Sequence, residues 1–212
     1  MSNILYTFEN QLSGVTGSFQ DVDVSNVKEE LEKWNLRKET DPDVYPILKT
    51  YWDYVKFGDN WTPSGTAWSS AFISYVLRDE EFPKRSAHFQ YIQDIINDNY
   101  PSWRAFSISK TPRLQLNIGD VLIKPRSASN TSTHGDIVYK IEDGIAYLVG
   151  GNVSNTAKVT ESIRVDQNNV VTGVVDDYVI ILKKKSSMKN VAIIGIVGLI
   201  GLGLFLNMSM KK

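Results

Sequence analysis

The stretch 133-THGDIVYKIEDGIAYLVG-150 decides the fold of this 212-residue chain. Two runs rich in β-branched and aromatic residues flank Asp143-Gly144, a dipeptide that favours the tight turn of a β-hairpin. Further short runs of similar composition occur at residues 120–124, 160–166 and 177–183. The second half of the chain therefore predicts a small antiparallel sheet.

The first half of the chain has a helical pattern instead. Apolar residues recur every three or four positions, as in helices with one buried face, within residues 25–35, 41–57, 67–77 and 86–97. Residues 1–24 lack this periodicity and are expected to be irregular. Helices followed by an antiparallel meander define an α+β fold, with N-terminal helices packed on the sheet.

Charge is unevenly distributed along the chain. Residues 1–182 hold 17 basic and 24 acidic side chains, a net charge of −7, whereas the last 30 residues carry +6. The acidic body lacks the clustered Lys and Arg of a nucleic-acid surface, so no nucleic-acid partner is expected. The chain has no Cys and two His. This excludes a cysteine nucleophile and makes a metal site improbable, and no cofactor is expected.

An uncharged apolar run begins at Val191 and ends at Met208, between groups of Lys. As a helix it would span about 27 Å, close to the roughly 30 Å core of a bilayer. We therefore expect one C-terminal transmembrane helix, with a buried core helix as the alternative. The Lys balance favours the body on the cytoplasmic side, and no secretory signal is visible. The expected organisation is a globular domain (1–182), a basic linker (183–190), the membrane helix (191–208) and a short tail (209–212).

Three segments carry residues suited to acyl transfer. Ser69 stands at the expected start of a helix, where backbone N–H groups favour a developing anion. His134 enters a strand and is suited to take the hydroxyl proton, while Asn152, after the next strand, is suited to orient the imidazole. Asp136 lies two residues from His134, on the same strand face, and could supply negative charge.

The same segments carry a resemblance to a known group of enzymes. In order, AWSSAFISYV, SAHFQY, GDVL, HGDIV and GGNV, with Tyr51-Trp52 upstream, resemble a poorly characterised bacterial and phage domain family. That family is related to the papain-like amidases and peptidases of the CHAP and NlpC type. The resemblance covers residues 50–155, about half of the chain. It implies a papain-like amidase fold, cleavage of a peptide or amide bond in bacterial peptidoglycan, and Ser69 where the superfamily has its nucleophilic Cys.

Three further residues are candidates for substrate binding. Trp68 could wall a cleft, the resemblance makes His88 a neighbour of the site, and Arg126 could bind a substrate carboxylate. Every candidate also has a purely structural interpretation. Ser69 could be a helix cap, Asn152 a turn residue, Trp68 and His88 core residues, and His134 a strand end bonded to a loop. Asp136 could pair with a nearby Lys or Arg, and Arg126 could be a solvated loop charge.

Two functions are compatible with these observations. The first is a membrane-anchored hydrolase that cleaves peptidoglycan through Ser69, His134 and Asn152, with the lipid bilayer and peptidoglycan as partners. Peptidoglycan lies outside the cytoplasmic membrane, so a phage virion membrane would reconcile this substrate with a body on the inner side. The second is a catalytically inactive, membrane-anchored structural or interaction protein with virion or membrane protein partners. A distance of about 3–4 Å between Ser69 and His134 would favour the first.

Overall fold

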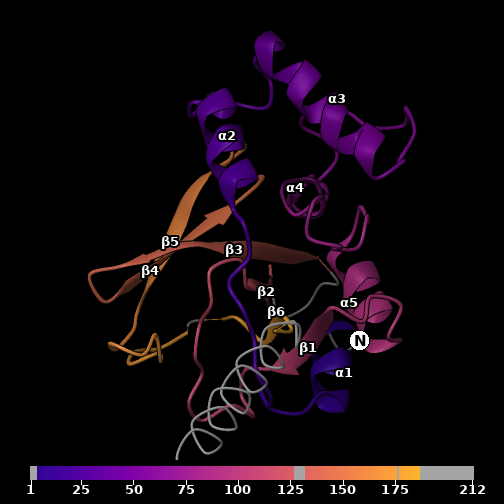
Figure 1. Ribbon diagram of the computed structural model, residues 1–212. Helices are drawn as coiled ribbons and strands as arrows, with labels where there is room; N and C mark the ends of the chain where they lie inside the picture. Colours follow the sequence, from indigo (N-terminus) through magenta and orange to yellow (C-terminus); the bar gives the residue numbers. More distant parts are fainter. Residues whose placement is uncertain (1–3, 127–131, 176, 187–212) are drawn as a thin grey trace, which may run out of the picture.

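The computed structural model describes residues 4–126, 132–175 and 177–186. The helices are α1 (Ile4–Gln11), α2 (Ser25–Trp34), the short 3-10 helix η1 (Pro42–Val44), α3 (Tyr45–Tyr54), α4 (Ser69–Val76) and α5 (His88–Ile96). The strands are β1 (Trp103–Ser107), β2 (Val121–Pro125), β3 (Thr133–Glu142), β4 (Ile145–Gly150), β5 (Lys158–Arg164) and β6 (Ile180–Lys184). Figure 1 shows α2 and α3 at one end of the molecule, α1 at the other, and α4 and α5 between them.

The six strands form one antiparallel sheet in the order β1-β6-β2-β3-β4-β5. The predicted hairpin joins β3 to β4, where Glu142 pairs with Ile145. Asp143 and Gly144 between them have φ angles of 51° and 75°. Positive φ at both turn positions matches the twist of the flanking strands. The hairpin prediction is therefore confirmed, and the described residues form an α+β fold.

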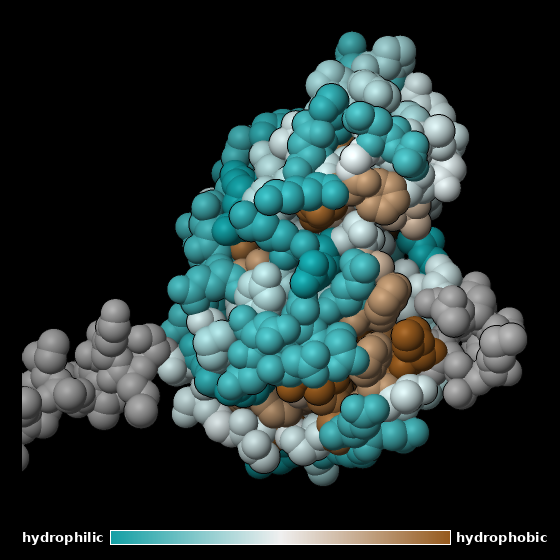
Figure 2. All heavy atoms as spheres, turned by 90° about the vertical axis from the view of Figure 1, so that its right-hand side faces the viewer, coloured by the Kyte–Doolittle hydropathy of each residue, from teal (hydrophilic) through white to brown (hydrophobic). Residues whose placement is uncertain are grey.

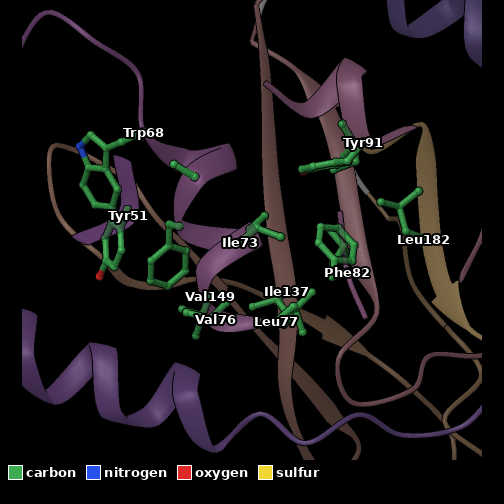
Figure 3. Close-up of a cluster of buried hydrophobic side chains, with 14 of the residues drawn as sticks. Tyr51, Trp68, Ile73, Val76, Leu77, Phe82, Tyr91, Ile137, Val149 and Leu182 are labelled. Carbon is green, nitrogen blue, oxygen red and sulfur yellow. The ribbon is translucent and has the colours of Figure 1, made fainter. Parts of the chain in front are cut away.

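Helix α4 is central to the main core. Seven of its eight residues are buried, and it packs against β3, β4, α2 and α3. Figure 3 shows Ile73 and Val76 of α4 in the same apolar cluster as Ile137 of β3 and Val149 of β4. Seen from the side that carries α3 and α5, the surface is mostly hydrophilic, with apolar side chains showing in separate patches (Figure 2).

The opposite face of the sheet carries a second apolar cluster, which includes Leu122, Val138 and Leu148. Side chains alternate along a strand, so Val138 faces this second cluster while its neighbour Ile137 faces α4. The same alternation extends back to the start of β3. It determines which polar side chains meet the helices there and which meet the other face.

Two elements were not predicted from the sequence. Helix α1 lies in the segment expected to be irregular, and its eight residues bury only Leu5 and Phe8. So short a helix shows little periodicity. Strand β1 pairs with β6, but it is buried at four of its five residues and so presents no alternation of apolar and polar positions.

Strand β6 extends to Lys184, inside the segment predicted to be a linker. Lys183 is 1% exposed, and its ammonium group donates to the carboxylate of Asp120 and to the carbonyl oxygen of Gln115. A buried ammonium group needs such partners because an unpaired charge away from water is costly. The Lys run therefore begins as part of the sheet.

The predicted membrane helix is the main correction to the fold. The α-helices of the described residues contain eight to ten residues, and none has the length and apolar character to cross a bilayer. Ten helical residues reach about 15 Å, half of the roughly 30 Å that is needed. The predicted span, residues 191–208, lies outside the described residues. The predictions of a transmembrane helix and of a membrane location are thus corrected and are not carried forward.

Candidate functional site

A pocket of about 370 Å³ opens beside the start of β3, on the sheet face that points away from α4 and α5. Strands β2, β3 and β5 and the loop after β4 supply its walls. Its lining is strongly polar, with two basic and two acidic side chains. The polar residues that line it are Lys124, Arg126, His134, Asn152, Ser154, Thr160, Glu161 and Asp177.

His134 is the residue of this pocket that is best suited to acid–base chemistry. It is second in β3, and strand alternation directs it to the same face as Asp136. Its Nε2 lies 3.1 Å from Oδ1 of Asp136, and its Nδ1 lies 3.5 Å from Nη2 of Arg126. A guanidinium only donates hydrogen bonds and an ionised carboxylate only accepts them. Nε2 therefore carries the proton, and Nδ1 presents its lone pair toward Arg126 and the pocket.

Asp136 is fully buried beneath His134. Burial raises the pKa of Asp136, but the hydrogen bonds from His134 and Tyr178 and the charge of Lys124 outweigh it, so the pKa lies below the usual value of an aspartate. Oδ2 accepts from the Tyr178 hydroxyl at 2.5 Å, and Oδ1 accepts from the Thr160 hydroxyl at 3.0 Å. Burial and then the charge of Asp136 raise the pKa of Tyr178, which keeps its proton. Asp136 is thus a fixed negative charge behind the imidazole.

Two glycines at the end of β4 allow close packing on both faces of the sheet. A Cβ atom on Gly150 would lie 2.2 Å from Oδ1 of Asp136 and 3.0 Å from Nε2 of His134. A Cβ atom on Gly151 would lie 2.6 Å from Cβ of Phe72 in α4. Real Cβ atoms do not approach their neighbours so closely. Gly150 is therefore required for the contact between His134 and Asp136.

Ser69 lies on the other face of the sheet, at the start of α4. Its hydroxyl is 3.3 Å from Nε2 of His88, whose Nδ1 is 2.9 Å from the hydroxyl of Thr133. Ser69 and His88 are only 2% and 4% exposed. Burial lowers the pKa of His88 to about 3, and the positive charge of Arg126 acts in the same direction. This imidazole is therefore neutral at neutral pH.

The remaining candidates are placed as follows. Trp68 is fully buried: it stacks on Trp34 with 4.5 Å between ring centroids, and its indole N–H donates to Glu39. It is a core residue and does not wall the pocket. Asn152 lines the pocket in a left-handed conformation, with φ of 59°. Arg126 is exposed at the pocket rim.

The structure thus brings His134, Asn152 and Arg126 to one pocket, places Asp136 beneath His134, and pairs Ser69 with His88. The hydrogen bond expected between Ser69 and His134 is not among those of the described residues. Ser69 contacts His88 on one face of the sheet, whereas His134 contacts Asp136 and Arg126 on the other. Sequence reasoning missed Thr133, although the signal was present. Adjacent residues of a strand face opposite sides, so His134 and Thr133 could not both face α4.

Tyr178 and Thr160, which hold Asp136, were also missed. Tyr178 lies 42 positions and Thr160 lies 24 positions further along the chain than Asp136, and no local pattern links them to it. In the part of the chain that the structure describes, no group of three or more His, Cys, Asp or Glu side chains is arranged to hold a metal ion.

Comparisons with protein-family models, with curated proteins and with solved structures found no match for this chain. The site is therefore interpreted from its own geometry.

Proposed function

We propose that the pocket is a hydrolytic site that cleaves an amide or peptide bond. One observation carries this proposal: His134 lines a polar pocket, its Nε2 is bonded to a buried carboxylate, and its Nδ1 has only a long contact with Arg126 of the same pocket. A carboxylate that holds an imidazole in one tautomer also stabilises the imidazolium that forms when the imidazole takes a proton. His134 has the surroundings of a general base, and Asp136 those of its orienting partner.

The proposed reaction uses a water molecule as nucleophile. Nδ1 of His134 takes a proton from water while the water oxygen bonds to the carbonyl carbon of the substrate. The imidazolium then returns the proton to the leaving nitrogen as the C–N bond breaks. Asn152 lines the same pocket, and its side-chain amide is suited to stabilise the negative charge on the carbonyl oxygen.

Ser69 is not the nucleophile in this proposal. Its hydroxyl contacts His88 rather than His134, and Ser69 does not line the pocket. The resemblance of the chain to papain-like amidases and peptidases makes peptides of bacterial peptidoglycan the first substrates to test.

The test is to incubate the purified full chain with peptidoglycan sacculi and with soluble peptides released from them, and to measure products by mass. We expect cleavage by the parent chain and a rate about 100- to 10,000-fold lower for His134→Gln, which lacks the base. His88→Gln is the matched control, assayed at a temperature where both variants remain folded. The absence of any product above the His134→Gln background would exclude this substrate class.

A ligand-binding protein without catalytic activity is the second candidate. It is favoured by the position of Ser69, which the resemblance implies as nucleophile and which is sealed away from the pocket. In that case peptidoglycan peptides bind the pocket and remain intact, and His134→Gln weakens binding. Calorimetry followed by mass analysis of the same sample separates binding from cleavage.

A further inference from the structure

Arg126 covers the nitrogen atom that the proposed reaction needs. Its Nη2 lies 3.5 Å from Nδ1 of His134, and its Nε donates to the carbonyl oxygen of Thr133 at 3.3 Å. The first contact is at the long limit for a hydrogen bond and is therefore weak. It nevertheless directs a donor at the lone pair that would accept a proton from water. In this arrangement the imidazole is not free to act as a base.

The guanidinium of Arg126 has no acidic partner among the described residues, whose salt bridges do not include it. The other cation of the pocket, Lys124, is paired with Glu161. Arginine offers five N–H donors in a planar fork that matches a carboxylate. Arg126 is exposed at the pocket, so its remaining donors are accessible to a ligand.

We propose that Arg126 binds a substrate carboxylate next to the bond to be cleaved and, by moving to that carboxylate, uncovers Nδ1 of His134. This inference rests on the proposed hydrolytic function and names its substrate class, which is peptides with a free carboxylate beside the scissile amide. Charge-assisted hydrogen bonds to the carboxylate replace a weak contact with a neutral ring. A peptide without the carboxylate leaves the base covered.

The acidic residues of the pocket favour a carboxylate over a phosphate group. Glu161 and Asp177 line the same pocket as Arg126. A phosphate monoester carries between one and two negative charges at neutral pH. Because these two negative charges offset those of Lys124 and Arg126, the pocket lacks the net positive charge that would draw in a phosphate more strongly than a carboxylate.

Binding can be tested without turnover, with N-acetylalanine, its uncharged amide and inorganic phosphate as probes of the full chain. We expect N-acetylalanine to bind and to shift the ¹⁵N signals of Nε of Arg126 and Nδ1 of His134, and the amide to bind more weakly. Arg126→Gln should weaken binding of the acid about 10- to 100-fold, the loss of a hydrogen bond to a charged group, and Arg126→Lys should restore part of it. Arg113→Gln, at an exposed arginine outside this pocket, should keep the parent affinity.

Three binding results would overturn the inference: equal affinity for the acid and the amide, tighter binding of phosphate than of the acid, or an Arg126→Gln variant that binds the acid as the parent does.

A turnover experiment separates this inference from the proposed function. Peptides with a free or an amidated C-terminus are compared, and amidation should lower kcat as well as kcat/KM because uncovering the base affects the chemical step. A loss confined to KM contradicts the uncovering. Arg126-dependent binding without cleavage of any peptide leaves carboxylate recognition standing and removes the hydrolase. Equal cleavage of both peptides removes the uncovering and leaves the hydrolase.

Discussion

The two histidines of the chain, His88 of α5 and His134 of β3, lie on opposite faces of β3 in contrasting surroundings. On the helix side, His88 is bonded to the hydroxyls of Ser69 and Thr133. On the pocket side, His134 is bonded to the buried carboxylate of Asp136. The two histidines are 4% and 8% exposed, so exposure of the whole residue does not distinguish them. They differ in their partners and in access to the pocket.

This difference shows why a serine–imidazole contact does not by itself indicate a catalytic pair. Two hydroxyl partners offer no negative charge to balance an imidazolium, and burial lowers the pKa of His88 to about 3. A base of such low pKa removes a hydroxyl proton poorly at neutral pH. Asp136 supplies the missing charge to His134. Replacing the partners of each imidazole therefore tests the comparison directly.

The largest effect is expected from Asp136→Asn. The substitution removes the charge that stabilises the imidazolium of His134, so peptide cleavage should fall about 100- to 10,000-fold. Cleavage rates are measured on samples whose folding is confirmed by circular dichroism. A folded Asp136→Asn variant with parent activity would show that His134 does not need this partner.

Acid stability should report on His88. Its pKa is lowered from 6.5 to about 3 on folding, so the unfolded chain takes up this proton first as the pH falls. The stabilising contribution of neutral His88 is therefore complete above about pH 6.5 and is lost toward about pH 3, by up to about 1.4 kcal/mol per pH unit. Urea unfolding at several pH values should give a shallower slope in this window for His88→Gln. Equal slopes for parent and variant would contradict the sealed environment of His88.

Thr133→Val removes a hydrogen-bond partner of His88, as Asp136→Asn alters the partner of His134. Valine has nearly the same shape but leaves Nδ1 of His88 without its hydroxyl partner, which should cost about 1–3 kcal/mol of folding free energy. Cleavage by the folded variant should stay within about threefold of the parent. A loss of activity as large as that of Asp136→Asn would break the comparison between the two faces.

The smallest effect is expected from Ser69→Ala. The lost hydrogen bond, at 3.3 Å, is long, so the free energy of unfolding should fall by about 1 kcal/mol. Denaturant unfolding and peptide cleavage are measured on the same preparation. Abolished cleavage with unchanged stability would identify Ser69 as the nucleophile and reverse the roles assigned to the two faces.

Local patterns predicted the elements with strong turn chemistry or clear periodicity. The β3–β4 hairpin follows from Asp143-Gly144 and its flanking runs, and α4 follows from a strongly apolar stretch of sufficient length. Helix α1 and strand β1 were missed because short or almost completely buried elements present no readable period. Hydropathy also has a limit as a predictor. It indicated a membrane helix at residues 191–208 from length and composition alone, and no helix of the described residues has the length and apolar character to cross a membrane.

The sequence alone determined that His134 and Asp136 lie on one face of a strand, because side-chain alternation is a property of the local backbone. It equally determined that Thr133 faces the other way. Only the tertiary structure decided which face α4 and α5 cover, and hence that Ser69 meets His88 and Thr133 rather than His134. It also decided that Tyr178 and Thr160 hold Asp136. Contacts between residues far apart in the chain depend on how helices and strands pack, and no local pattern records that.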